Sequence, residues 1–218
     1  MRGRVVNINN SGSVVKRAST EEKKLQRRAT ILKKARAWIS GHAFSEIRLA
    51  DMARELGLVK GTLYLYFPTK QDLFSSILIE EMEAWWASFR RAPVTTPGPD
   101  LVEGLSSREL LVRLLSSLHM AIEPGLSPDG LRSFKMWFLD FAGRATHDLE
   151  MRYPPLKGRS FLFLMGVYSL TLGASQLAFP PENVRSFVCS ENALQSLRID
   201  FRDFLTPSID ALYKGYGA

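Results

Sequence analysis

Apolar positions recur every three or four residues along most of this 218-residue chain, which is the spacing of helices with one buried face. No stretch keeps the strict alternation of apolar and polar positions that is typical of a strand. Glycine- and proline-containing segments interrupt the helical pattern at 93–99, 123–130, 154–155 and 180–181. The pattern predicts an all-α fold with about nine helices.

The first of these helices is expected from about Thr20 to Ser40. Ser19 followed three residues later by Glu22 is a capping-box pattern. The predicted inner stripe has Ile31 at its edge and consists of Leu25, Leu32, Ala35, Trp38 and Ile39. Residues 1–18 follow neither helical nor strand spacing and carry four Lys or Arg, so we expect a flexible basic arm there.

Residues 49–70 combine two short helices with a glycine between them. Gly57 can end the first helix, because glycine adopts the left-handed conformation without steric cost. A second short helix over 60–67 would turn Leu63 inward, and Pro68 would end it. The short helix before Gly57 has an apolar stripe made of Leu49, Met52, Ala53 and Leu56. This is the helix-turn-helix arrangement, whose second helix enters the DNA major groove, although a hairpin within a helical bundle gives a similar pattern.

Positive charge is concentrated in the same part of the chain. Residues 1–70 hold fifteen Lys or Arg against five Asp or Glu, whereas residues 71–218 hold fourteen against seventeen. The net charge of +7 therefore belongs to the N-terminal third, which favours attraction to DNA phosphates. For many cations of the first helix, a solvated face is the simpler explanation.

The segment Gly57-Leu-Val-Lys-Gly-Thr-Leu-Tyr-Leu-Tyr-Phe-Pro-Thr-Lys70 resembles the DNA-binding signature of the tetracycline-repressor (TetR) family of bacterial transcriptional regulators. The resemblance covers about residues 20–85, and the rest is similar only in length and helical character. It implies a helix-turn-helix domain over 19–68 and a helical effector-binding and dimerisation domain over 69–218. No signal-peptide pattern opens the sequence, so we expect a cytoplasmic protein.

Most of the candidate DNA contacts lie on the second short helix and at its borders, and two lie at the starts of the neighbouring helices, Arg48 and Lys70. Lys60 can reach a phosphate or a guanine, the hydroxyls of Thr62 and Tyr64 can donate to phosphates, and Leu65 suits a thymine methyl. The full set is Arg48, Val59, Lys60, Gly61, Thr62, Tyr64, Leu65, Tyr66 and Lys70.

Two of these positions depart from the family pattern. Relatives usually carry Ser or Thr at the starts of the second and third helices, where this chain has Arg48 and Val59, and neither side chain can cap a helix in that way. We expect Arg48 to contact a phosphate instead, and Val59 to contact a base methyl. A second capping pattern, Thr69-Lys-Gln-Asp72, predicts a helix to about Arg91 that starts beside Lys70, where a DNA phosphate fits.

Residues 160–181 contain no charged side chain, which is long enough to raise the question of a membrane helix. Small and polar residues interrupt the segment and favour a buried helix. A short recognition helix covers few base pairs, so we expect a homodimer. The predicted interface joins this segment to the last helical region, 183–213, through Gly166, Ser169, Gly173, Gln176, Leu194, Leu197, Phe201 and Phe204. Burial of both helices within one subunit is the alternative.

Aromatic residues are frequent in the middle of the chain, on the helices expected near 70–91 and 131–151, and a further helix is expected near 106–122. At helical spacing such residues are usually core, but the resemblance implies a small apolar or aromatic effector among the central helices. The candidate pocket residues are Trp85, Trp86, Phe89, Leu115, His119, Phe134, Trp137, Phe138, Phe141 and Tyr168.

The resemblance implies a ligand-responsive repressor that binds a palindromic operator as a homodimer. The alternative is a nucleoid-type protein that binds DNA without sequence preference and without an effector. An enzyme is disfavoured, because the three histidines and Cys189 lack metal-ligand spacing and no phosphate-binding glycine motif or nucleophile elbow is present. No cofactor and no metal are predicted.

Overall fold

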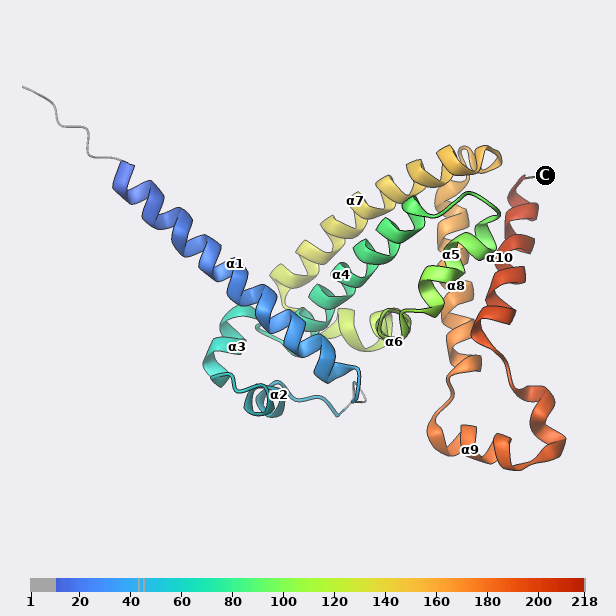
Figure 1. Cartoon of the computed structure of the whole chain (residues 1–218), viewed down its shortest axis with the longest axis horizontal. Helices are drawn as coiled ribbons and strands as arrows, with labels where there is room; N and C mark the ends of the chain where they lie inside the picture. The colour runs from blue at the N-terminus through green and yellow to red at the C-terminus, as the bar shows by residue number, and fades with distance from the viewer. Residues whose placement is uncertain (1–10, 43, 45, 218) are drawn as a thin grey trace, which may run out of the picture. The chain divides into compact units, whose positions relative to one another are not determined.

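The computed structural model describes residues 11–42, 44 and 46–217 of the chain. These residues form ten α-helices and no strand, which confirms the all-α prediction with one helix more than expected (Figure 1). The chain divides into two compact units, Met1–Pro68 and Thr69–Ala218.

Helix α1 spans Ser11–Ile39 and so begins well before the predicted start at Thr20. Ser19 lies inside the helix, and the predicted capping box with Glu22 is wrong. The helix can extend backwards because neither glycine nor proline occurs between Val14 and Thr20. Of the expected flexible arm, residues 11–18 are helical, and residues 1–10 lie outside the described part of the chain.

The buried stripe of α1 is shorter than predicted. Ile31, Leu32, Ala35 and Ile39 are buried, whereas Leu25 is 66% exposed, which corrects its assignment to the stripe. The other two helices of this unit, α2 (Leu49–Glu55) and α3 (Lys60–Tyr66), have seven residues each. Each is roughly 10 Å long and can cover only part of α1, which is roughly 44 Å long.

Glycine ends α2 as the sequence predicts. Gly57 has φ +65°, and its N–H donates to the carbonyl of Arg54 at 3.2 Å. The N–H of Leu58 donates to the carbonyl of Ala53 at 2.8 Å, which completes a Schellman motif. This turn directs the chain from α2 into α3.

The second unit contains seven α-helices and several short 3₁₀ and π segments within its described residues. The α-helices are α4 (Lys70–Arg91), α5 (Pro97–Ser106), α6 (Glu109–Ser117), α7 (Pro128–Arg152), α8 (Ser160–Ala178), α9 (Glu182–Ser190) and α10 (Phe201–Gly217). The ribbons of α4 and α7 run side by side, as do those of α8 and α10 (Figure 1).

Helix α4 has the boundaries that the sequence predicts. Thr69 caps it: the Oγ1 atom accepts from the N–H of Asp72 at 3.0 Å, and the Asp72 carboxylate accepts from the N–H of Thr69 at 3.0 Å. The predicted capping box is therefore confirmed.

Helix α5 was not predicted: its first residues, 97–99, were expected in a loop, and the next helix was expected only from about residue 106. Pro97 occupies the first helical position, where a missing N–H and a fixed φ are compatible with a helix. The single helix expected over 106–122 is instead divided into α6 and a π-helical turn, Leu118–Ile122.

The last helical region, expected as one unit over 183–213, is also divided. Leu194 and Leu197 lie in a 3₁₀ segment, Asn192–Leu197, and not on the helix that carries Phe201 and Phe204. The helix starts anew because the Asp200 side chain accepts from the N–H groups of Arg202 and Asp203. Figure 1 shows α9 and the 3₁₀ segment extending beyond the ends of α8 and α10.

Helix α8 is the one described helix that is long and apolar enough to cross a membrane, with a mean hydropathy of 1.5. It packs against α6, α7 and α10 within the second unit. Only 33% of its apolar window is buried, so the segment is in part the buried helix that its small and polar residues predict.

Candidate DNA-binding helix and ligand cavity

Helix α3 buries one side and presents the other to solvent. Leu63 is buried within the helix, as predicted, and Phe67 is buried at its end. Leu65 and Val59 are 77% and 72% exposed, which is unusual for apolar side chains of this size. Among the other predicted DNA contacts, Arg48, Lys60, Gly61 and Tyr64 are exposed, and Thr62, Tyr66 and Lys70 are half-buried.

The two departures from the family pattern are visible as uncapped helix starts. Arg48 is the N-cap residue of α2 and Val59 that of α3, and neither makes a side-chain capping hydrogen bond. Both residues therefore lie at the helix starts where the sequence analysis placed them.

Side chains of α1 hold the ends of the two short helices. Lys34 Nζ donates to the carbonyl of Leu56 at 3.2 Å, beside the C-terminus of α2 where a cation is favoured. Trp38 Nε1 donates to Glu55 Oε2 at 2.5 Å. The Arg28 guanidinium lies 5.2 Å from the Phe67 ring centre, after α3. Sequence reasoning treated Arg28 and Lys34 only as solvated or phosphate-facing cations, and missed these structural roles.

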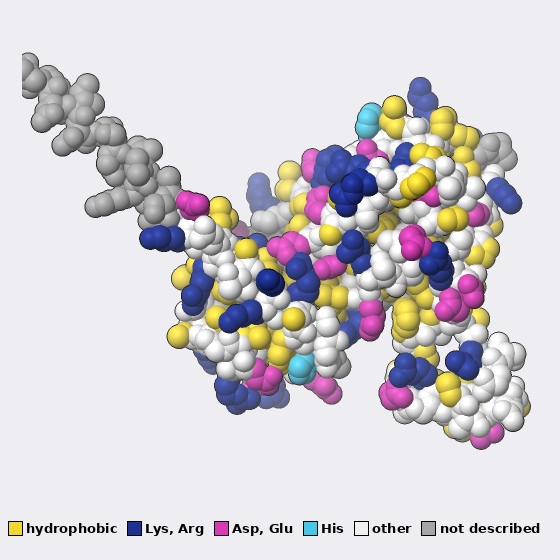
Figure 2. All heavy atoms as spheres, in the orientation of Figure 1, with side chains coloured by type: hydrophobic (Ala, Val, Ile, Leu, Met, Phe, Trp, Pro, Cys, Tyr) yellow, Lys and Arg dark blue, Asp and Glu magenta, His cyan; other side chains and the backbone are white. Residues whose placement is uncertain are grey.

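Exposed cations cover this unit. Figure 2 shows dark-blue Lys and Arg side chains over α1–α3, with a few magenta carboxylates among them. Lys60 on α3 belongs to this set, and its Nζ atom lies 5.8 Å from the Tyr64 ring centre. The surface is therefore positively charged beside exposed hydroxyl and apolar groups, a mixture that suits DNA backbone and base edges.

The second unit contains a cavity of about 170 Å³. Its walls come from α4, α5, α6, the π-helical turn, the 3₁₀ turn Glu123–Gly125, α7 and α8. Eight of the ten candidate pocket residues line it, namely Trp85, Leu115, His119, Phe134, Trp137, Phe138, Phe141 and Tyr168. The lining residues that the sequence did not indicate are Leu78, Met82, Leu105, Leu118, Glu123, Lys135, Leu164, Met165, Val167 and Thr171.

Trp86 and Phe89 do not line the cavity. Trp86 is buried and donates its Nε1–H to Asp148 at 2.7 Å, so it joins α4 to α7. Phe89 lies under the guanidinium of Arg152, which is 4.5 Å from its ring centre. Both side chains pack the interface between these two helices.

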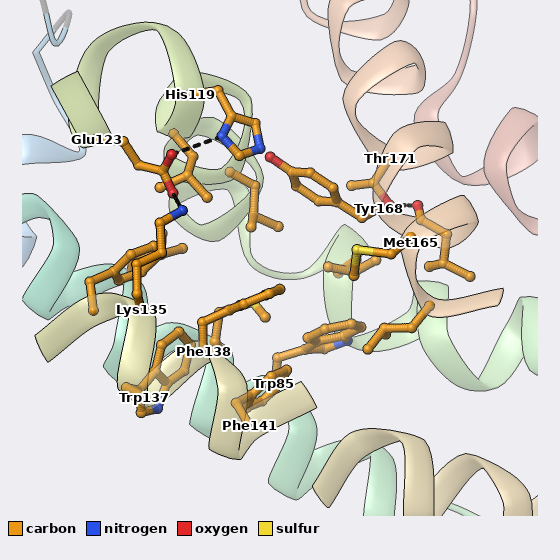
Figure 3. Close-up of a pocket in the computed structure, with 18 residues that line it drawn as sticks. Trp85, His119, Glu123, Lys135, Trp137, Phe138, Phe141, Met165, Tyr168 and Thr171 are labelled. Carbon is orange, nitrogen blue, oxygen red and sulfur yellow. Dashed lines mark hydrogen bonds and ion pairs between the residues drawn. The ribbon is translucent and has the colours of Figure 1, made fainter. Parts of the chain in front are cut away.

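One end of the cavity is polar. Glu123 pairs with Lys135 Nζ at 2.6 Å and with His119 Nδ1 at 3.1 Å (Figure 3). Burial raises the pKa of the Glu123 carboxyl, but the hydrogen bonds from Lys135 and His119 outweigh it and hold the pKa below its usual value. The four-residue spacing of His119 and Glu123 was a signal that could have indicated this pair.

Tyr168 stands at the same end, with its ring edge toward His119 at a centroid distance of 5.8 Å (Figure 3). Its hydroxyl oxygen is buried and has no hydrogen-bond partner in the described structure. Burial, and then the negative charge of Glu123, raise the pKa of Tyr168 to about 12. The group is therefore an unpaired O–H donor at neutral pH.

The remaining polar groups of the wall are already paired. Trp85 donates its Nε1–H to the carbonyl of Leu101 at 3.1 Å, and Trp137 donates to Glu83 at 2.9 Å. The Thr171 hydroxyl donates to the carbonyl of Val167 at 2.8 Å. The indole rings therefore offer the cavity mainly apolar surface.

The charge-free helix α8 has one exposed face. Ser169, Gly173 and Gln176 are exposed there, and a Cβ at Gly173 would meet no atom within 4 Å. Gly166 differs, because a Cβ there would lie 2.7 Å from Leu212 of α10. Gly166 therefore allows α8 and α10 to approach each other within one chain.

The other predicted interface residues are divided in a similar way. Phe204 of α10 is 37% exposed and Leu197 is 62% exposed, whereas Leu194 is half-buried and Phe201 is buried. Leu197 and Phe204 are therefore the exposed apolar side chains of this set.

A short exposed helix after a glycine turn, on a basic three-helix unit, defines a helix-turn-helix DNA-binding protein. Two family models match the chain: residues 31–77 match "Bacterial regulatory proteins, tetR family", and residues 80–218 match "Tetracyclin repressor-like, C-terminal domain". The chain therefore belongs to the TetR family and is a bacterial DNA-binding transcriptional regulator. Proteins of this family are generally not enzymes. A comparison with individual curated proteins gives no match.

Proposed function

We propose that this protein is a cytoplasmic, ligand-responsive repressor that binds a palindromic operator as a homodimer. The observation that carries the proposal is the outer face of α3, where Leu65 is 77% exposed beside Lys60 and Tyr64. An apolar side chain so exposed buries little surface within its own unit. It is well suited to a thymine methyl in the major groove.

The other groups of this unit are assigned by their chemistry. Lys60 and Arg48 bind phosphate or guanine, and Tyr64 and Thr62 donate their hydroxyls to phosphates. Val59, Gly61 and Tyr66 border the groove, and Lys70 supplies a charge at the start of α4. Base preference then depends chiefly on Leu65 and Val59, because phosphate contacts carry little sequence information.

Dimerisation is proposed through the outer faces of α8 and α10. The exposed small residues Ser169 and Gly173 allow close helix approach, and Phe204 and Leu197 supply apolar area. A second copy that packs the same faces gives a two-fold arrangement, which matches an inverted repeat with half-sites roughly 34–36 Å apart or a multiple of this distance.

Ligand response is proposed through the start of α4. The Gln71 side chain donates to the carbonyl of Ala121 at 3.3 Å, in the π-helical turn that also carries His119. A ligand that moves His119 or Glu123 therefore acts on the first turn of α4. It releases DNA only to the extent that it binds the two conformations of the dimer with different affinity.

Selection of random duplex DNA by the purified protein at about 150 mM salt tests the proposal, because non-specific phosphate binding is weak there. We expect enrichment of one inverted repeat. The matched selection with Leu65→Ala should relax the preference at a thymine position. A nucleoid-type protein would bind the library without enrichment and contradict the proposal.

A further inference from the structure

We propose that the cavity of the second unit takes a neutral, single-ring molecule with one hydrogen-bond acceptor, such as a carbonyl oxygen, to which Tyr168 donates. The inference rests on the proposed ligand response of this cavity and names the class of ligand. Four features of the cavity each restrict the ligand: its volume, its apolar walls, the unpaired Tyr168 hydroxyl and the paired charges of Glu123 and Lys135.

The volume limits the ligand to about one ring with a short substituent. The cavity measures about 170 Å³. Closed apolar cavities of about 150 Å³ in proteins are large enough to bind benzene. A ring with a substituent of only a few non-hydrogen atoms is therefore about the largest ligand that the space accepts without movement of the helices.

The walls select an apolar or aromatic body. Trp85, Phe138 and Phe141 face the cavity from α4 and α7 (Figure 3). The Nε1–H groups of Trp85 and Trp137 are bonded to Leu101 and Glu83, so these rings leave no unmet donor toward the ligand. A second polar substituent deep in the cavity would lose its hydration without gaining a partner.

The Tyr168 hydroxyl selects an acceptor at one end of the ligand. Its oxygen is buried without a hydrogen-bond partner in the described residues, and it remains protonated at neutral pH. An unpaired buried donor is costly, so a ligand that supplies an acceptor is favoured over one of equal size that does not.

Charge balance selects a neutral ligand. Glu123 already pairs with Lys135 at 2.6 Å and faces His119 at 3.1 Å. A carboxylate ligand would add an unpaired negative charge beside Glu123, and an ammonium ligand would compete with Lys135 for the same carboxylate. Either would be partly removed from water without a free counter-charge.

The same geometry fixes the direction of the ligand. The side chains of His119 and Lys135 are more than half exposed, so the polar end of the cavity is also its mouth. The ring therefore enters first and lies between the aromatic walls, and its acceptor stays near Tyr168.

Four probes of similar size test this class: acetophenone, ethylbenzene, benzoate and benzylammonium. Titration of the full-length protein, without DNA, to about 5 mM covers the affinities expected for so few atoms. Trp85 and Trp137 in the wall provide a fluorescence signal. We expect acetophenone to bind about fivefold more tightly than ethylbenzene, from one net hydrogen bond, and more tightly than either charged probe.

The variant Tyr168→Phe removes only the hydroxyl and should abolish the preference for acetophenone over ethylbenzene while leaving ethylbenzene binding unchanged or tighter. Tyr213→Phe is the matched control, since Tyr213 packs on Tyr153 and Phe163 away from the cavity. It should keep the preference.

Three results would overturn the inference: tighter binding of benzoate or benzylammonium, a preference for acetophenone that survives in Tyr168→Phe, or no binding of any probe. DNA selection separates these failures from failure of the proposed function. A protein that enriches an inverted repeat but binds no probe is a regulator with another ligand. Binding of acetophenone without enrichment of any sequence would support the ligand class of the cavity and contradict the proposed operator-binding repressor.

Discussion

Asp72 and Ser127 join the N-termini of α4 and α7. Oδ1 of Asp72 accepts from the backbone N–H of Ser127 at 3.2 Å and from its hydroxyl at 2.9 Å, while Oδ2 accepts from the N–H of Thr69 at 3.0 Å. One buried carboxylate therefore caps one helix and holds the residue that caps another.

Substitution of Asp72 by Ala should lower the free energy of unfolding by about 2–3 kcal/mol, because it removes a cap and leaves buried N–H groups unpaired. Urea denaturation followed by circular dichroism measures the change. Ser127→Ala should cost less, and the double variant should be less destabilised than the sum of the two. Additive effects would show that the Asp72–Ser127 contact contributes nothing.

We expect Asp100 to stabilise the fold in a pH-dependent way. It is buried between Arg152, at 3.1 Å, and the hydroxyl of Tyr153, at 2.5 Å. Burial raises the pKa of Asp100, but hydrogen bonds from Thr95, Tyr153 and Arg152 outweigh it and lower the pKa below the usual value. Because the pKa is lower in the folded state, the stabilisation is present above the unfolded pKa and is lost as the pH falls through the folded pKa.

Asp100→Asn should therefore be less stable than wild type by about 3 kcal/mol at pH 7, where Arg152 loses its buried counter-charge. The difference should shrink as the pH is lowered below about 4. Denaturation at a series of pH values measures it. A difference that stays constant between pH 7 and pH 3 contradicts this account.

Lys60→Gln should weaken operator binding by about tenfold and reduce the slope of log K against log salt by about one, as expected for the loss of one phosphate contact. Lys214→Gln, on the exposed surface of α10, is the matched control and should change neither. Fluorescence anisotropy at several salt concentrations gives both quantities. An unchanged slope for Lys60→Gln would mean that its charge does not meet a phosphate.

Gly173→Glu should weaken self-association by about 100-fold or more, because each copy would bury an unpaired charge at the proposed two-fold interface. The fold should tolerate the change, since a Cβ at Gly173 meets no atom within 4 Å and glycine is a poor helix former. Gly143→Glu on α7 is the control, because that position is equally open. Sedimentation equilibrium should show dimers for wild type and Gly143→Glu. Dimeric Gly173→Glu protein would place the interface elsewhere.

Local signals predicted the helix-turn-helix region and the start of α4. Gly57 adopts the left-handed conformation, Arg48 and Val59 begin their helices without a side-chain cap, and Thr69 forms the expected capping box. Each of these features depends on residues within a few positions of one another, so the local sequence is enough to predict it.

Features that depend on distant residues were missed. Leu25 has helical spacing to the buried residues of α1, but the described residues leave it 66% exposed. Helix α5 starts at Pro97, and the N–H of the next residue, Gly98, donates to the carboxylate of Asp210 on α10 at 2.8 Å. Aromatic spacing alone did not separate Trp86, which packs between helices, from Trp85, which lines the cavity. Only the three-dimensional packing decides these cases.

The spacing of operator half-sites tests the central claim most directly. The inverted repeat obtained by selection is compared at about 150 mM salt with a duplex in which about 5 base pairs are added between the half-sites, which turns one half-site by half a helical turn. A dimeric regulator should lose about 100-fold in affinity for the altered duplex. Equal affinity for the two duplexes would contradict the proposal that both subunits read one palindromic operator.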